Sequence, residues 1–117
     1  MSLKFEVSVR KGVVILHCKG RIAYREDAAA LMEKVAELLP KTQQLVLEFS
    51  GVERIDRSAL GELAVIMMWA RAAKCSVRLA GARTHIRELL EWTNLVSVIQ
   101  VDASLDHAVL ALRSPAA

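Results

Sequence analysis

The segment IDRSALG, residues 55–61, holds the side chains whose types and spacing are best suited to chemistry. Asp56 and Ser58 stand two positions apart, with Arg57 between them. Both are residue types that cap a helix N-terminus. A phosphate on such a serine would add roughly two negative charges, and the free N–H groups and positive end of the helix would stabilise it. The segment predicts a plain helix cap or a phosphate switch.

The helix expected after this turn, residues 58–74, is apolar on nearly every side. Between Ala59 and Ala70 the only charged residue is Glu62. A helix of this kind is either fully buried or leaves an apolar patch that binds something, and a small domain has difficulty burying every face. One face can pack on a sheet: Leu60, Leu63, Met67 and Ala70. The remainder predicts a partner surface beside Ser58, made of Glu62, Val65, Met68 and Trp69.

A phosphate on Ser58 would act on that surface through its charge. Burying an unpaired charge against an apolar partner costs several kcal/mol by order of magnitude. Because the helix terminus itself tolerates the anion, the fold would survive while the partner is released. Arg57 would neutralise part of the added charge.

Catalysis is the alternative that these residues predict least. Ser58 and Asp56 could be combined with His17, His85 or His107 in a triad. The glycines of a nucleophile elbow are missing around Ser58, and the histidines fall on separate elements. The sequence also lacks a phosphate-binding loop of the G-x-x-x-x-G-K type and a metal-ligand cluster. We therefore expect no enzyme, no cofactor and no metal.

The elements around the turn alternate between strand and helix periodicity, in the order ββαβαβαβα. This order predicts an α/β fold with a mixed, mostly parallel sheet, an antiparallel edge hairpin and packed helices. We expect one domain over residues 1–117, with a frayed tail at 113–117. The expected strands are 4–10, 13–20, 45–49, 76–82 and 96–101, and the expected helices are 25–39, 58–74, 84–95 and 104–112, the last capped by Ser104.

Composition narrows the class of protein. The chain has 117 residues, of which 54% are hydrophobic and 25% charged, which is typical of a globular domain. The net charge is +3, but the lysines and arginines are scattered among the acidic residues. The alternation of basic and aromatic residues that is typical of a single-strand nucleic-acid binder is missing. No stretch is long enough to cross a membrane, and the start of the chain does not read as a signal peptide. Cys18 and Cys75 are predicted to be buried and reduced, which indicates a cytoplasmic protein.

Over nearly its whole length the sequence resembles the STAS domain family, whose best-known members are bacterial anti-sigma factor antagonists. The most specific segment is LVLEFSGVERIDRSALGEL, where Asp56, Arg57, Ser58, Ala59, Leu60 and Gly61 match the switch turn of the family. VVILHCKGRI and AGARTHIRELLEWTNL extend the likeness on either side. The resemblance implies a regulatory binding protein in which Ser58 is phosphorylated by a kinase that is itself the anti-sigma factor. A phosphatase would reverse the modification, and Asp56 would shape the turn and position the hydroxyl.

Two departures from the family pattern concern charge. Arg57 replaces a small hydroxyl residue, and GRIA at 20–23 replaces an acidic stretch, so that Arg21 adds positive charge near the turn. The partner surface therefore includes Arg21. We expect either a differently charged partner or a STAS subunit that is never phosphorylated and docks on an ABC-transporter ATPase or in a larger signalling assembly. The chain itself is expected to be a monomer or a weak homodimer.

Overall fold

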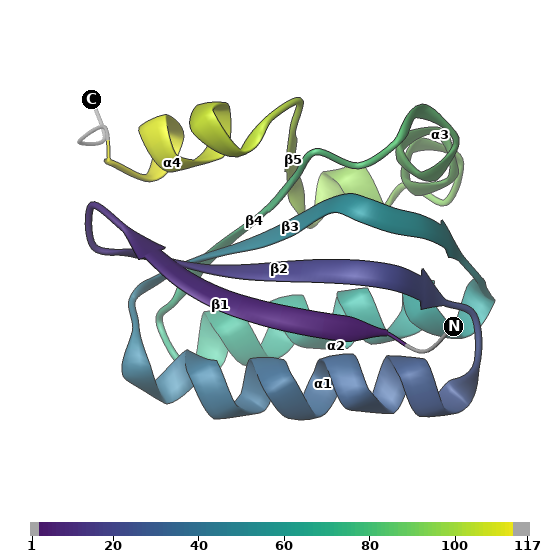
Figure 1. Cartoon of the computed structure of the whole chain (residues 1–117), viewed down its shortest axis with the longest axis horizontal. Coiled ribbons are helices and arrows are strands. Elements are labelled where there is room, and N and C mark those ends of the chain that lie inside the picture. Colours follow the sequence, from purple (N-terminus) through teal and green to yellow (C-terminus); the bar gives the residue numbers. More distant parts are fainter. Residues whose placement is uncertain (1–2, 114–117) are drawn as a thin grey trace.

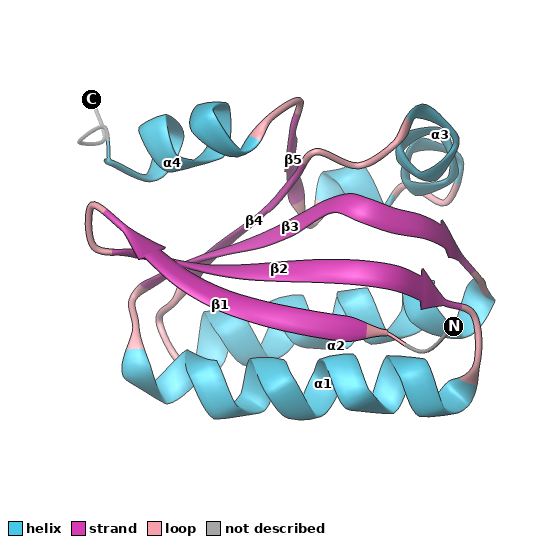
Figure 2. Cartoon of the chain, in the orientation of Figure 1, coloured by secondary structure: helices cyan, strands magenta, loops and turns pink. Residues whose placement is uncertain are grey.

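Five strands form one mixed sheet whose spatial order, β1-β2-β3-β4-β5, is also the order of the chain. This arrangement comes from a computed structural model that describes residues 3–113. Helices cover both faces of the sheet (Figure 1, Figure 2). The predicted α/β class and element order are confirmed, with two 3-10 turns added. The elements are β1 Lys4–Arg10, β2 Val13–Ile22, α1 Arg25–Leu38, η1 Leu39–Lys41, β3 Gln44–Ile55, α2 Arg57–Ala72, β4 Ser76–Ala80, α3 Thr84–Trp92, η2 Leu95–Ser97, β5 Gln100–Asp102 and α4 Leu105–Arg113.

The direction of the strands determines which loops share an end of the molecule. β1 pairs with β2 in antiparallel fashion as the edge hairpin, and β2, β3, β4 and β5 are parallel. The carboxyl ends of β2 and β3 therefore lie side by side, and the turn into α2 begins there. The N–H of Asp56 donates to the carbonyl of Ile22 at 3.1 Å, which fixes this turn to the end of β2.

The core has two parts, one on each face of the sheet. α1 and α2 lie side by side under the sheet in Figure 1, and Ile86 and Leu90 of α3 belong to the same large cluster. α4 covers part of the opposite face through a smaller cluster. The residues predicted to form the buried stripe of α1 are all buried: Ala28, Leu31, Met32, Val35, Leu38 and Leu39.

β3 is much longer than the strand expected at 45–49. Its second half pairs with residues 19–22 of β2, across two irregularities in the register. Gly51 permits this close pairing, because a Cβ at that position would lie 3.0 Å from the carbonyl oxygen of Cys18. Ser50, Glu53 and Arg54 are exposed, and these polar residues hide the second half of β3 from a hydrophobicity pattern.

The expectation of a helix at 84–95 followed by a strand at 96–101 is wrong in its boundary. α3 ends at Trp92, and Asn94 adopts the left-handed conformation with a φ of 61°, which stops the helix. Leu95–Ser97 form a 3-10 turn, and only Gln100–Asp102 pair with β4. Val96 and Val98 gave a strand-like alternation, but both side chains are exposed.

The observed bounds of several other helices and strands differ from the expected ones by only one or two residues. The helix expected at 58–74 is Arg57–Ala72, the strand expected at 76–82 is Ser76–Ala80, and Pro40 lies inside a 3-10 turn that follows α1. Ser104 caps α4 as predicted, since its hydroxyl accepts a hydrogen bond from the N–H of His107 at 3.1 Å. Of the tail expected at 113–117, Arg113 ends α4 and the remaining residues lie outside the described part of the chain.

Candidate functional site

The turn that begins α2 divides the two cap-type residues into separate roles. Asp56 is the N-cap, with an extended backbone, and its Oδ1 accepts a hydrogen bond from the N–H of Ala59 at 3.1 Å. Ser58 is the second residue of the helix and is exposed. Its Oγ donates to the same Oδ1 of Asp56 at 2.6 Å. The helix is therefore capped without the Ser58 hydroxyl, which is accessible and held against a carboxylate.

Electrostatics keep that carboxylate ionised. The hydrogen bond from the Ser58 hydroxyl lowers the pKa of Asp56 most, and partial burial opposes it. The N–H groups of Ala59 and Ser58 and the charge of Arg54 lower the pKa further. An ionised carboxylate at 2.6 Å orients the hydroxyl hydrogen toward itself and leaves the Oγ lone pairs directed elsewhere. This is the arrangement that a hydroxyl needs in order to attack an electrophile.

α2 buries one face, and its exposed apolar side chains lie toward the C-terminal end of the helix, about three turns from Ser58. The buried residues are Ala59, Leu60, Leu63, Ile66 and Ala70. Met68 and Trp69 remain 70% and 39% exposed, whereas Val65 and Met67 are half-buried and pack against the core. Gly61 is exposed and Glu62 half-buried. Sequence reasoning missed Ile66 as a core residue, although its spacing of three from Leu63 and four from Ala70 is the signal that identifies it.

A shallow apolar groove extends the exposed face of α2 toward its C-terminal end. It has a volume of about 590 Å³ and runs between α2 and the segment before β5. We call Met68, Trp69 and Val98 the α2 patch, because these exposed apolar side chains lie on α2 or on this groove. The groove is lined by Ala64, Met67, Met68, Arg71, Ala72 and Val98.

Arg21 lies at the end of β2 that bears the switch turn. It is paired across the sheet with Arg54, and the next residue, Ile22, bonds the N–H of Asp56. The guanidinium of Arg21 stands 5.2 Å from the centre of the Tyr24 ring, close enough for a cation–π contact. Its Nε is buried and has no hydrogen-bond partner within residues 3–113. Arg21, Arg54 and Arg57 bring three positive charges to this end of the sheet, which also carries the carboxylates of Glu53 and Asp56.

The histidines considered for a triad lie in other environments. His17 bonds the hydroxyl of Ser8 at 2.9 Å, and its Nδ1 stands 3.9 Å from the carboxylate of Glu48. The ring of His85 contacts the carbonyl of Glu53 at 2.7 Å, and His107 is exposed on α4. None of these histidines shares a hydrogen bond with Ser58 or Asp56 in the described structure.

Residues 3–113 have neither a metal-ligand cluster nor a membrane-spanning helix. No group of three or more metal-ligand side chains gathers there. None of the helices described combines the length and apolar character required to cross a bilayer. Cys18 and Cys75 are both free and buried, in agreement with their predicted burial.

Comparison with known proteins places the turn in a family context. The model of the STAS domain matches residues 4–108, which include the whole switch turn and the α2 patch. The chain belongs to the STAS domain family. A comparison with curated proteins gives no match.

Solved structures support the STAS fold over nearly the entire chain. An anti-sigma factor antagonist from Mycobacterium paratuberculosis is 23% identical, with a TM-score of 0.86, over 97% of this chain and 96% of that one. The phosphorylated form of the Bacillus cell fate determinant SpoIIAA is 16% identical, with a TM-score of 0.69, over 94% and 100%. The STAS domain of a SulP transporter from Vibrio cholerae is 14% identical, with a TM-score of 0.66, over 90% and 84%. At these identities the likeness establishes the fold alone.

Proposed function

We propose that this STAS protein is a regulatory binding module of the anti-sigma factor antagonist type, switched by phosphorylation of Ser58. The observation that supports this proposal most directly is the exposed Ser58 hydroxyl, bonded at 2.6 Å to the ionised carboxylate of Asp56. Asp56 already caps the helix, so modification of Ser58 leaves that cap in place. The phosphorylated solved structure of the same fold is consistent with such a switch.

The transfer step uses the two side chains in distinct roles. The Ser58 Oγ attacks the terminal phosphorus of ATP held by a partner kinase, a new O–P bond forms, and ADP leaves with the bond electrons. The hydroxyl proton moves to Asp56 and then to solvent. Metal-bound ATP and most transition-state stabilisation come from the kinase, as is general for phosphoryl transfer. Asp56 contributes orientation of the hydroxyl and a proton acceptor within hydrogen-bond distance.

Binding of the partner uses the α2 patch together with the turn. Without phosphate, Met68 and Trp69 offer apolar area that a partner can bury. With phosphate, roughly two negative charges lie about three helical turns from that area, at the edge of the same interface. Desolvating those charges against a partner costs several kcal/mol, which is enough to dissociate a tight complex.

The proposal assigns partners and a setting. The partner that binds and phosphorylates Ser58 is an anti-sigma factor with serine kinase activity, and a phosphatase removes the phosphate. The protein acts in transcription regulation and signalling in a bacterial cytoplasm, without catalysis of its own. It binds neither nucleic acid nor a cofactor, and it is a monomer or weak homodimer.

An experiment in the native cells tests the modification first. Intact-mass measurement of the purified protein is expected to show a species heavier by one phosphate, which is absent in Ser58→Ala. Proteins that co-purify with Ser58→Ala are then compared with those retained by Ser58→Asp. An ATP-binding kinase retained by the alanine variant and at least tenfold weaker with the aspartate variant agrees with the switch.

The opposite pattern identifies the second candidate, a STAS subunit that docks constitutively. Arg57 and Arg21, which replace residue types typical of the switch family, favour this candidate. It predicts no phosphate under any growth condition and equal retention of an ABC-transporter ATPase or signalling assembly by Ser58→Ala and Ser58→Asp. That result would remove the switch while retaining the α2 patch as the docking surface.

A further inference from the structure

Lysine and arginine side chains gather at the end of the molecule opposite the switch turn. This end contains the amino ends of the parallel strands, the tip of the β1–β2 hairpin and the C-termini of α2 and α4. A volume of about 670 Å³ between these segments is lined by residues that include Gly12, Lys41 and Ala73, which brings three separate elements together. Arg113 donates to the carbonyl of Lys11 at 3.1 Å, which fixes the end of α4 to the hairpin tip. We call Lys11, Lys41, Arg71, Lys74 and Arg113 the basic end.

These five cations form no ion pair with a carboxylate inside residues 3–113. The ion pairs found nearby use other side chains: Arg10 with Asp106, Arg78 with Asp102, and Lys34 with Glu37. The net charge of the whole chain is +3, from 16 basic and 13 acidic residues. The basic end accounts for +5, so 11 basic and 13 acidic residues elsewhere sum to −2. Because the nearby ion pairs are neutral as units, the five cations that are unpaired within residues 3–113 leave this end with a local excess of positive charge.

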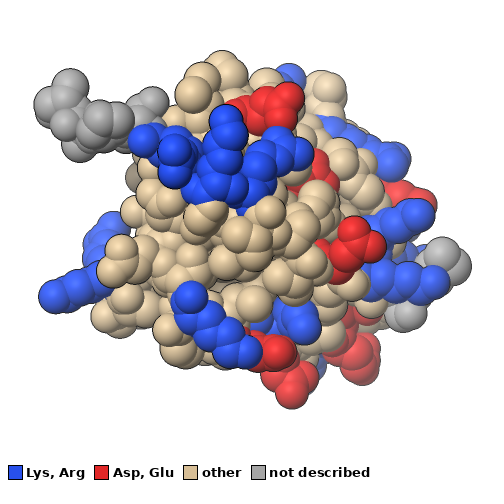
Figure 3. Space-filling view, turned by 60° about the vertical axis from the view of Figure 1, so that its left-hand side comes forward, with Lys and Arg blue, Asp and Glu red and all other residues tan. Residues whose placement is uncertain are grey.

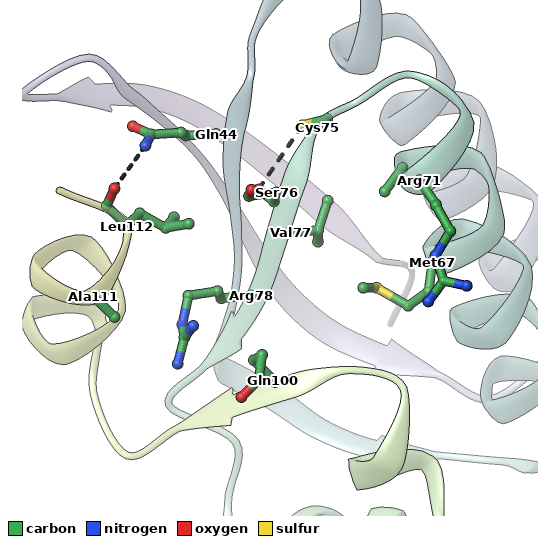
Figure 4. A pocket seen from close by; sticks show the side chains of 11 residues that line it. Gln44, Met67, Arg71, Cys75, Ser76, Val77, Arg78, Gln100, Ala111 and Leu112 are labelled. Carbon is green, nitrogen blue, oxygen red and sulfur yellow. Dashed lines mark hydrogen bonds between the residues drawn. The ribbon is translucent and has the colours of Figure 1, made fainter. Parts of the chain in front are cut away.

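Figure 3 turns this end toward the viewer and shows one dense group of Lys and Arg side chains in its upper part, with further Lys and Arg side chains and several Asp and Glu side chains spread over the rest of the face. Figure 4 shows the neighbouring hollow, of about 480 Å³, between α2 and α4. Arg71 comes from the α2 side, Leu112 from the α4 side, and Ser76 and Arg78 from β4 between them. The cations thus surround hollowed, partly polar surface rather than a closed apolar core.

Part of this charge has a structural explanation, and part does not. Arg71 and Arg113 lie in the last turns of α2 and α4, where a cation stabilises the negative end of the helix dipole. Lys11 and Lys74 lie in turns with a positive φ, outside any helix, and Lys41 ends a 3-10 turn. All three lysines are exposed, so their charges face solvent.

We propose that the basic end is a peripheral docking surface for an anionic phospholipid membrane. Three of its five cations are lysines, which bind phosphate groups as flexible point charges and need no fixed geometry. Exposed apolar side chains are near them in the chain: Val9, two residues before Lys11, is 66% exposed, and Leu110, one turn before Arg113, is 64% exposed. Cations beside protruding aliphatic groups suit a headgroup layer, whereas an acidic protein surface would pair with the cations alone.

Docking by this end has a consequence for the switch. The turn at Ser58 follows the carboxyl end of β3, whereas the basic end surrounds the first residue of that strand. A strand of this length spans roughly 35 Å at ~3.3 Å per residue. A protein docked on a membrane through the basic end would therefore present Ser58 away from the lipid, whereas the α2 patch, whose groove Arg71 lines, would lie beside the docked surface.

Vesicle sedimentation with the complete chain tests the inference. Binding to vesicles of phosphatidylglycerol and phosphatidylcholine is compared with binding to phosphatidylcholine alone, at ~0.1 M and ~1 M salt, between which the Debye length falls from about 10 Å to about 3 Å. We expect binding only to the mixed vesicles and only at the lower salt. Lys11→Gln/Lys41→Gln/Lys74→Gln should lower the apparent affinity at least tenfold, since each cation near an anionic membrane contributes about a fivefold factor.

The matched control removes the same charge elsewhere. Lys4→Gln/Lys19→Gln/Arg87→Gln neutralises three exposed cations outside the basic end and should reduce binding by less than about threefold, through net charge alone. Equal losses for the two triple variants would show that only net charge matters and would overturn the proposal. The proposal would also be overturned if the protein bound poly-glutamate through the basic end but did not bind either kind of vesicle. That result would indicate an acidic protein partner instead.

Discussion

At the residue scale, the Asp56 carboxylate accepts hydrogen bonds from both the Ser58 hydroxyl and the Ala59 N–H, and each bond is stronger to the charged form. Its pKa therefore lies below the ordinary value of 3.8. A group with a lowered pKa in the folded state contributes stability above its unfolded pKa and loses that contribution as the pH falls through its folded pKa. Asp56→Asn should be less stable than wild type at neutral pH, and the difference should shrink below about pH 4.

Urea unfolding of wild type and Asp56→Asn between about pH 2 and pH 7 measures this difference directly. Asp56→Ala also removes the helix cap and should cost about 1 kcal/mol at pH 7. Ser58→Ala is the control, because it leaves the Ala59 N–H capped, and it should cost less than Asp56→Ala. A stability difference between wild type and Asp56→Asn that stays constant with pH would mean that the carboxylate charge does not stabilise the turn.

Which of the two cap-type residues performs the capping was not determined by the sequence. Asp56 and Ser58 have similar N-cap preferences, so residue type left both assignments open. The choice depends on backbone geometry, since the N–H of Asp56 bonds the carbonyl of Ile22 and places the start of the helix one residue later. That bond joins two segments far apart in the chain, and local propensity does not contain this information.

At the element scale, α2 combines core and surface on adjacent residues, and this can be tested by substitution. Met68→Glu and Trp69→Glu place a charge on exposed positions, so they should leave the unfolding midpoint nearly unchanged while weakening partner binding at least tenfold. Ile66→Glu is the matched control on the same helix, because Ile66 is completely buried and a charge there should unfold the domain.

Thermal unfolding followed by circular dichroism separates these outcomes before any partner is known. Loss of the fold in Met68→Glu would show that this side chain packs in the core and would remove the α2 patch as a binding surface. Val65 is half-buried and contacts the core, so it lies between the exposed Met68 and the fully buried Ile66. Val65→Glu should therefore lower the unfolding midpoint by an intermediate amount.

The helices were predictable from periodicity, because each buries a single stripe, as the buried residues of α1 show. The alternation in β1 also predicted a strand, although its apolar residues Val7 and Val9 are exposed rather than half-buried. Two elements were not predictable in this way for physical reasons. The second half of β3 carries Glu53 and Arg54, whose strand conformation depends on pairing with β2 rather than on burial. Val96 and Val98 have the pattern of a strand, but the left-handed residue Asn94 starts a 3-10 turn instead.

At the scale of the whole molecule, the two cysteines can distinguish local from global unfolding, because they become exposed by different motions. Cys18 lies in the middle of β2, which pairs with β1 on one side and β3 on the other. Cys75 lies in the short connection between α2 and β4. Burial raises the pKa of both thiols, and for Cys18 the charge of Glu48 adds to the effect. Neither thiol should therefore react appreciably in the native state.

Pulse labelling with N-ethylmaleimide across a urea series, read by mass spectrometry of each cysteine peptide, distinguishes local from global opening. Cys18 can be exposed only by separating β2 from its neighbours, so the free energy derived from its labelling should equal the free energy of global unfolding and fall with urea in the same way. Cys75 needs only fraying of one connection, so it should react earlier, with a weak dependence on urea. Equally fast labelling of both thiols without urea would mean that β2 opens independently, and the sheet would then not unfold as one cooperative unit.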